Sequence, residues 1–193
     1  MLFNNQDEIN QSLQGIASRD NGDLIISDAE KIRGDILDQL VLNAAINPAP
    51  DVKGFSRYIL KSAALELGIV PSSIQGLYEA RGRGEVKGFT VPALNIRGLP
   101  YELCRAIFRT ALKTEAGAFI FELAKSEMGY TFQKPQELSA VILGAAIKEG
   151  YKGPVFIQGD HFQVNAKNYA KDRAKEIEGL KKTHRRWDRG CLL

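Results

Sequence analysis

Short apolar runs alternate with longer amphipathic segments from Gly88 onward, and this alternation limits the possible folds more than any other feature. Residues of strand character occupy 89–96, 118–123 and 154–158. Between these runs, apolar residues recur at helical spacing over 101–113 and 135–150. Strands that alternate with helices of this length are typical of βα units in a parallel sheet. The sequence therefore predicts an α/β fold with about three βα units.

Three such units are too few for a closed barrel. A (β/α)8 barrel takes about 250 residues, whereas the whole chain has 193. We therefore expect an incomplete (β/α)8 TIM barrel preceded by a small helical region. The predicted organisation is a helical extension and linker over 1–85, the N-terminal portion of a barrel domain over 86–182, and an aberrant basic tail over 183–193.

The first 85 residues are expected to form helices. They contain no histidine or cysteine and no evident catalytic or metal-binding motif. Ser27 and Glu30 have the spacing of a capping box, so a helix is expected to begin there and to end at the prolines of 47–50. A second helix is expected from Ser56 to Leu67, with Gly68 as its C-terminal cap. We interpret this region as an appendage that packs on another part of the structure.

Composition argues against nucleic-acid and membrane partners. The formal net charge is +3, but five of the 26 basic residues lie in the last thirteen positions, whereas a nucleic-acid-binding surface is usually basic throughout. The Arg-Gly pairs of 81–84 are too few for a phosphate loop and are interpreted as a linker. No apolar run approaches the roughly 18 residues of a membrane helix, and the N-terminus has no signal-peptide pattern. We expect a cytoplasmic protein.

Polar side chains follow the predicted strands at their C-terminal ends. These ends carry Asn95, then the run 125–127 (Lys-Ser-Glu), then Gly159, Asp160 and His161. Parallel α/β folds place functional groups at this edge. An imidazole there binds metals or transfers protons near neutral pH, and a neighbouring carboxylate acts as general acid or base, with Gly159 giving backbone freedom. A helix-capping Asp160 beside a surface His161 is the alternative that this dipeptide leaves open.

These three segments resemble class II, zinc-dependent fructose-bisphosphate aldolases. Gly88–Asn95 is similar to the first barrel strand of that family, and Ala118–Tyr130 to the second strand and its loop. Gly153–His161 is similar to the third strand, which ends in an Asp-His pair. The resemblance covers 86 to about 182, and the preceding residues resemble an extension found in some members.

The resemblance implies an aldehyde-lyase of glycolysis and carbohydrate metabolism. Such an enzyme reversibly cleaves fructose 1,6-bisphosphate into dihydroxyacetone phosphate and glyceraldehyde 3-phosphate with Zn2+ as cofactor. By the same resemblance, His161 is a zinc ligand, Asp160 moves the proton of the C4 oxygen, and Asn95 and Ser126 contact the substrate. Tagatose 1,6-bisphosphate is the alternative sugar, and the full-length protein is expected to form a homo-oligomer.

The resemblance ends where a fourth βα unit is expected. A catalytic zinc needs three protein ligands, and in this family the other two histidines come from later strands. The remaining histidine here, His184, and Cys191 lie in the basic tail and belong to no strand end. We therefore expect an incomplete zinc site in a truncated or frame-shifted chain that is inactive alone. A genuine short protein is the alternative.

Two non-catalytic functions also stay open at this point. The chain could be an aldolase-derived half-barrel that pairs with another chain, or it could bind nucleic acid through its basic tail. Zinc binding with aldol cleavage would favour the enzyme, and stable dimerisation without zinc would favour the half-barrel. Binding to DNA that weakens steeply with salt would favour the tail.

Overall fold

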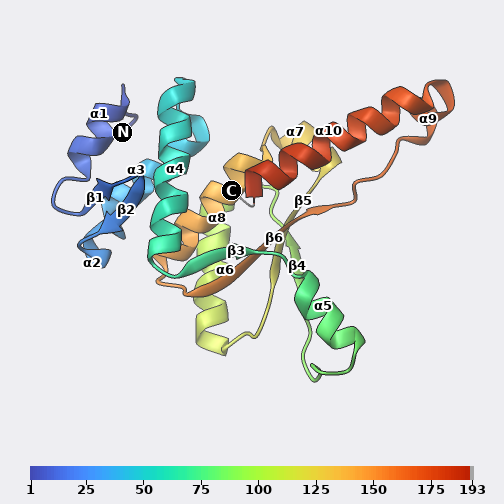
Figure 1. The fold of residues 1–193 in the computed structure, drawn as a ribbon, viewed down its shortest axis with the longest axis horizontal. Coiled ribbons are helices and arrows are strands. Elements are labelled where there is room, and N and C mark those ends of the chain that lie inside the picture. Colours follow the sequence, from blue (N-terminus) through green and yellow to red (C-terminus); the bar gives the residue numbers. More distant parts are fainter. Residues whose placement is uncertain (192–193) are drawn as a thin grey trace. The chain divides into compact units, whose positions relative to one another are not determined.

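The computed structural model describes residues 1–191, and at 184 and 186–191 it describes the backbone alone. Figure 1 labels its elements, which are in chain order α1 (Gln6–Ser12), β1 (Ala17–Asp20), β2 (Asp23–Ile26), α2 (Ala29–Ile32), α3 (Asp35–Ile46), α4 (Pro50–Glu66), β3 (Ile69–Ser72), α5 (Gln75–Gly82), β4 (Ala93–Asn95), α6 (Pro100–Thr114), β5 (Ile120–Ala124), α7 (Lys125–Thr131), α8 (Pro135–Lys148), β6 (Gly153–Asp160), α9 (Ala166–Lys171) and α10 (Arg173–Cys191). Among these residues, no helix is both long enough and apolar enough to cross a membrane.

The chain divides into two compact units, each built from three segments. The first unit contains Met1–Val70, Leu99–Ala116 and Glu137–Val155. The second contains Pro71–Gly98, Gly117–Gln136 and the residues from Phe156 onward. The boundaries predicted at 85 and 182 stay predictions.

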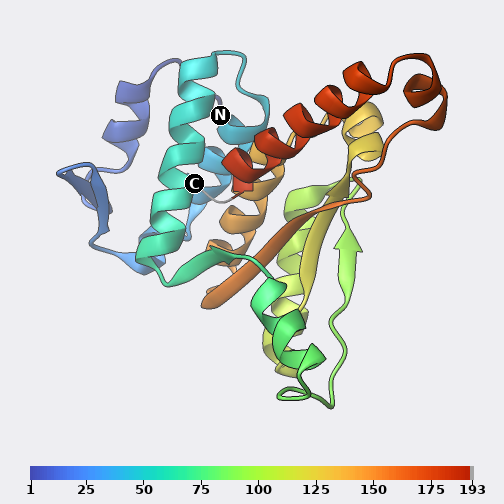
Figure 2. The same ribbon diagram turned by 45° about the vertical axis from the view of Figure 1, so that its right-hand side comes forward.

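The main sheet has the strand order β3-β6-β5-β4. β4 pairs with β5 in parallel, and β5 pairs with β6 in parallel; Figure 2 shows β4 beside β5. The helices α6 and α8 come between these strands in the chain, so the α/β class predicted from the alternation is confirmed. β5 is buried along its whole length, as expected for a central parallel strand.

β4 is shorter than the sequence predicted. The strand was expected over 89–96 but covers Ala93–Asn95 alone. The residue before it is Pro92, which has no N–H to donate to a ladder; its carbonyl accepts a hydrogen bond of 2.9 Å from the amide of Ile120. The proline therefore marks the beginning of the regular strand.

The capping box predicted at Ser27 is wrong. The side chain of Asp28 caps α2 instead, accepting from the amides of Glu30 and Lys31 at 3.1 and 3.0 Å. The helix expected behind it is broken at Gly34 into α2 and α3. Asp28 is the residue directly before the first residue of α2, so its carboxylate reaches the free amides of the first turn.

The second helix begins earlier than predicted. α4 starts at Pro50 rather than at Ser56, because a proline is well suited to the first turn of a helix, where its missing N–H costs nothing. Gly68, with φ of 78°, follows the C-terminus of this helix as predicted. The hairpin of β1 and β2, turning at Asn21 and Gly22, was not predicted as strands.

The N-terminal helices pack on α8 within the first unit. A Cβ atom at Gly144 of α8 would overlap Cγ2 of Val41 in α3 and lie 3.5 Å from Cδ2 of Leu60 in α4. Both neighbours are buried, and α8 itself is almost entirely buried. The appendage predicted from sequence is therefore part of the core of this unit.

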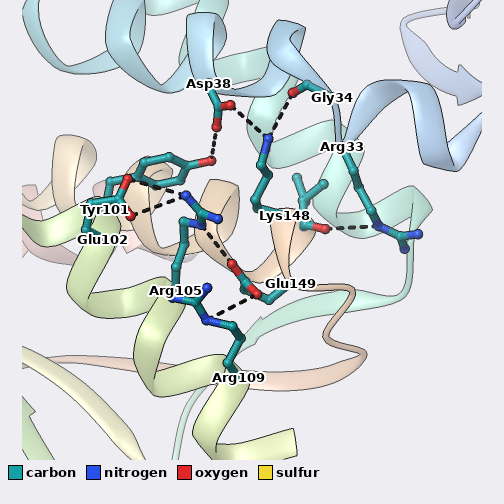
Figure 3. Close-up of polar contacts among 10 residues, drawn as sticks. Arg33, Gly34, Asp38, Tyr101, Glu102, Arg105, Arg109, Lys148 and Glu149 are labelled. Carbon is teal, nitrogen blue, oxygen red and sulfur yellow. Dashed lines mark hydrogen bonds and ion pairs between the residues drawn. The ribbon is translucent and has the colours of Figure 1, made fainter.

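A polar network in the same unit joins α3, α6 and α8 (Figure 3). Lys148 Nζ lies 2.8 Å from Oδ2 of Asp38, and the hydroxyl of Tyr101 donates to Oδ1 of Asp38 at 2.7 Å. Burial raises the pKa of Tyr101, and its bond to Asp38 raises that pKa further. Arg105 Nε donates to Glu149 at 2.7 Å. These bonds connect residues more than 40 positions apart and fix the helices against one another.

Candidate functional site

The C-terminal ends of three consecutive parallel strands bring polar side chains together in the second unit. Asn95 is the last residue of β4, and Asp160 is the last residue of β6. Glu127 lies in the first turn of α7, which follows β5 directly. The strand-end cluster, defined as Asn95, Arg97, Glu127, Asp160 and His161, thus comes from one edge of the sheet.

The side-chain amide of Asn95 connects the two carboxylates of this cluster. Its Nδ2 donates to Oε2 of Glu127 at 3.0 Å and to Oδ2 of Asp160 at 3.1 Å. An amide nitrogen carries two hydrogens, so both are used by carboxylate oxygens. Asn95 therefore bridges residues that lie 32 and 65 positions further along the chain.

Asp160 and His161 form a close pair. Nδ1 of His161 lies 2.5 Å from Oδ1 of Asp160, and the imidazole is 74% exposed whereas the carboxylate is 19% exposed. Burial alone would raise the pKa of Asp160, but the hydrogen bonds from His161 and Asn95 outweigh it and lower the pKa below the usual value. This carboxylate is therefore ionised at neutral pH.

Glu127 is the most buried member of the strand-end cluster. It is 4% exposed, and its Oε2 also accepts from the amide of Ala124 at 2.9 Å while its Oε1 lies 2.5 Å from Nε of Arg97. Burial raises the pKa of Glu127, but the bonds from Ala124, Asn95 and Arg97 lower it more, so the net shift is downward. Both carboxylates that Asn95 connects are therefore ionised at neutral pH.

The structure does not bring Ser126 into the strand-end cluster. Ser126 is exposed in the first turn of α7 and is not one of the residues that bond to Asn95 or Asp160. The next residue, Glu127, is the one in α7 that bonds to Asn95. Sequence reasoning assigned no role to Arg97, although alternation along an extended chain places it on the same face as Asn95.

A further pair of polar side chains, Glu122 and Gln158, lies level with Asn95 in the sheet. Asn95, Glu122 and Gln158 are register partners across β4, β5 and β6. Gln158 Nε2 donates to Oε2 of Glu122 at 2.9 Å, and Glu122 is 8% exposed. Sequence reasoning missed this pair, although a charged residue in the middle of an apolar strand was a signal for it.

The constraint at Gly159 differs from the one predicted. Its φ is not in the left-handed region, so backbone freedom is not needed there. A Cβ atom at this position would instead overlap the ring of Phe162. The unusual backbone belongs to His161, whose φ is 45°, a conformation uncommon for residues other than glycine.

The residues at this edge do not complete a zinc site. A catalytic zinc takes three protein ligands, and His161 supplies one imidazole. Among the residues that the structure describes, no group of three or more His, Cys, Asp or Glu side chains could hold a metal ion. Cys104 is buried in α6 of the other unit, and the side chains of His184 and Cys191 lie outside the described ones.

Acid is expected to destabilise the fold through Glu127. Its pKa is lowered in the folded state, so its contribution to stability is present above the unfolded pKa, about 4.3, and is lost as the pH falls through the folded value. The free energy of unfolding of the wild type should therefore fall more between about pH 6 and pH 3 than that of Glu127→Gln. Urea unfolding at several pH values measures this, and equal falls in both proteins would contradict it.

The chain was also compared with known proteins. No model of a protein family, no curated protein and no solved structure matches it.

Proposed function

We propose that this chain is the N-terminal part of a class II ketose-bisphosphate aldolase, with its parallel strands as the first units of a TIM barrel. The observation that supports this most is the strand-end cluster, because barrel enzymes carry their active sites at the C-terminal ends of the strands. A second support is the sequence resemblance of Gly153–His161 to the third strand of that family, which also ends in an Asp-His pair. The proposed substrate is fructose 1,6-bisphosphate, with tagatose 1,6-bisphosphate as the alternative, in a cytoplasmic aldehyde-lyase.

In this proposal Asp160 is the proton acceptor. Its carboxylate takes the proton of the C4 hydroxyl as the bond between C3 and C4 breaks. C4 becomes an aldehyde carbon, and the electron pair of the broken bond passes through C3 to the C2 carbonyl oxygen, giving an enediolate. Asn95 holds the carboxylate through the 3.1 Å bond to Oδ2, and His161 holds Oδ1. In the direction of synthesis the same group returns the proton.

The zinc implied by the resemblance needs ligands besides His161. We therefore propose that this chain alone is inactive, and that cleavage belongs to a longer product or to an assembly that supplies two more ligands. With purified chain and added zinc, we expect no cleavage of fructose 1,6-bisphosphate above background and no tight 1:1 zinc site. A coupled spectrophotometric assay and calorimetry measure the two. Cleavage by the chain alone would contradict the inactivity.

Binding of a triose phosphate tests the proposed substrate class directly. Dihydroxyacetone phosphate added to the ¹⁵N-labelled chain should shift the resonances of Asn95, Arg97 and His161. Asn95→Ala should weaken this binding, and inorganic phosphate is the matched control without the carbon-bound hydroxyl group. Shifts that are equal with phosphate, or that lie away from the strand-end cluster, would contradict the proposal. Reading the gene beyond the codon of Leu193 is an independent test, since further βα units with two histidines at strand ends would support it.

A non-catalytic half-barrel is the second candidate, and one observation favours it. Among the residues that the structure describes, β4 is the last strand in the order of the sheet and pairs with β5, so no further strand pairs with its other edge, where a strand from another chain could add. Stable dimerisation without zinc, with amides of Ala93–Asn95 protected from exchange in the dimer, would support this function over the enzyme.

A further inference from the structure

The strand-end cluster contains a buried carboxylate to which neither the resemblance nor the proton transfer assigns a role. Glu127 is 4% exposed and accepts three hydrogen bonds, two from Asn95 and Arg97 at and just beyond the end of β4 and one from the backbone amide of Ala124 in β5. A buried carboxylate is costly unless donors surround it, so its retention at this edge needs an explanation. Its hydrogen bond with Asn95 offers such an explanation.

We propose that Glu127 is a positioning residue that fixes the side-chain amide of Asn95 in one orientation. This inference rests on the proposed function, because it names what that orientation offers to a ligand. Glu127 takes one hydrogen of Asn95 Nδ2, and Asp160 takes the other. With both hydrogens directed to carboxylates, Oδ1 is the amide atom left to meet a ligand, and it acts as an acceptor.

Fixing the orientation requires Glu127 itself to be immobile. The amide of Ala124 donates to the same oxygen as Asn95, at 2.9 Å, and closes the first turn of α7. Arg97 Nε occupies the other oxygen. These three hydrogen bonds to its two oxygens fix the orientation of the Glu127 carboxylate. The orientation of the Asn95 amide is fixed in turn, because Asn95 donates to that carboxylate.

The chemical consequence is a preference for one kind of ligand group. A ligand hydroxyl can donate to Oδ1 of Asn95, whereas a phosphate or carbonyl oxygen meets an acceptor and is disfavoured. If Glu127 were absent, Asn95 would keep one carboxylate partner and one amide hydrogen would become free. Its amide would then present a donor as well as an acceptor, and the discrimination would weaken.

The experiment measures exchange of the Asn95 side-chain amide with water by NMR, in the full chain without ligand. Hydrogen bonds to charged groups contribute enough to slow exchange by about tenfold or more. In the wild type, both hydrogens should exchange at least about tenfold more slowly than those of the exposed Asn21. If either hydrogen exchanges at the rate of Asn21, the proposal is overturned without the need for any variant.

Two substitutions separate positioning from general structure. In Glu127→Ala, one hydrogen of Asn95 should lose its protection by about tenfold. In Glu127→Gln, the amide oxygen can still accept from Ala124 and Asn95, so protection of Asn95 should be retained while Arg97 becomes mobile. Ser126→Ala, at the exposed neighbouring position, should leave Asn95 unchanged. The positioning role would be contradicted if Asn95 lost the same protection in all three variants, or if it lost protection in none of them.

Binding of dihydroxyacetone phosphate distinguishes this inference from the proposed function. If the wild type binds the compound, Glu127→Ala should weaken binding and Glu127→Gln should retain most of it. Equal affinities of Glu127→Ala and wild type would overturn the positioning role. If the wild type shows protected Asn95 hydrogens but binds no triose phosphate, the orientation of Asn95 stands and the proposed aldolase function fails.

Discussion

Phe121→Ala should lower the free energy of unfolding by about 3–5 kcal/mol, the largest effect that we expect from a single substitution. Phe121 is fully buried in β5, and its ring contacts that of Phe119 in an edge-to-face arrangement with centroids 5.6 Å apart. Since successive side chains of a strand point to opposite faces, it lies on the face away from Glu122. The substitution therefore leaves a cavity without removing any group of the strand-end cluster.

Urea unfolding followed by circular dichroism measures this loss. Phe132→Ala is the matched control, because Phe132 is 83% exposed and the same truncation there should change stability by less than about 0.5 kcal/mol. A loss at Phe121 no larger than that at Phe132 would show that β5 is not the buried central strand described above.

Gly144→Leu should destabilise the first unit by about 1 kcal/mol net. The added side chain would overlap Val41 and press on Leu60, and overpacking of this kind costs about 1–3 kcal/mol. Replacement of a helical glycine returns up to about 1 kcal/mol through helix propensity, so the steric cost has to exceed that gain. The result tests whether α8 packs directly on α3 and α4.

Gly54→Leu is the control for the propensity term. Gly54 lies within α4, and a Cβ there meets nothing within 4 Å, so this variant should be stabilised by about 0.5–1 kcal/mol. Truncating the neighbour in Val41→Ala should restore part of the stability of the Gly144 variant. If Gly144→Leu is as stable as Gly54→Leu, the close approach at Gly144 is wrong.

Periodic patterns predicted the regular elements well, because their information is local. Helices at 101–113 and 135–150 were found close to their observed limits of Pro100–Thr114 and Pro135–Lys148. One failure came where neighbouring residues compete for one role. Asp28 capped a helix that Ser27 was expected to cap.

The strand-end cluster was predictable in outline but not in its bonds. The strand ends indicated Asn95 and the Asp160–His161 pair correctly as neighbours at one edge. Which residue of the run 125–127 bonds to Asn95 depends on the direction of one helical turn, and in the structure it is Glu127. Contacts between residues 32 and 65 positions apart cannot be inferred from spacing along the chain.

The bridge made by Asn95 also sets an order in which the cluster can form during synthesis. Asn95 leaves the ribosome first, Glu127 follows, and Asp160 is added last. Before Asp160 has been synthesised, the side-chain amide of Asn95 can bind only the carboxylate of Glu127. Arg97, which pairs with Glu127, has already been synthesised by then. The strand-end cluster is therefore completed when β6 is added to the sheet. In a series of arrested nascent chains, protection of the Asn95 side-chain amide from exchange would show when this third parallel strand docks.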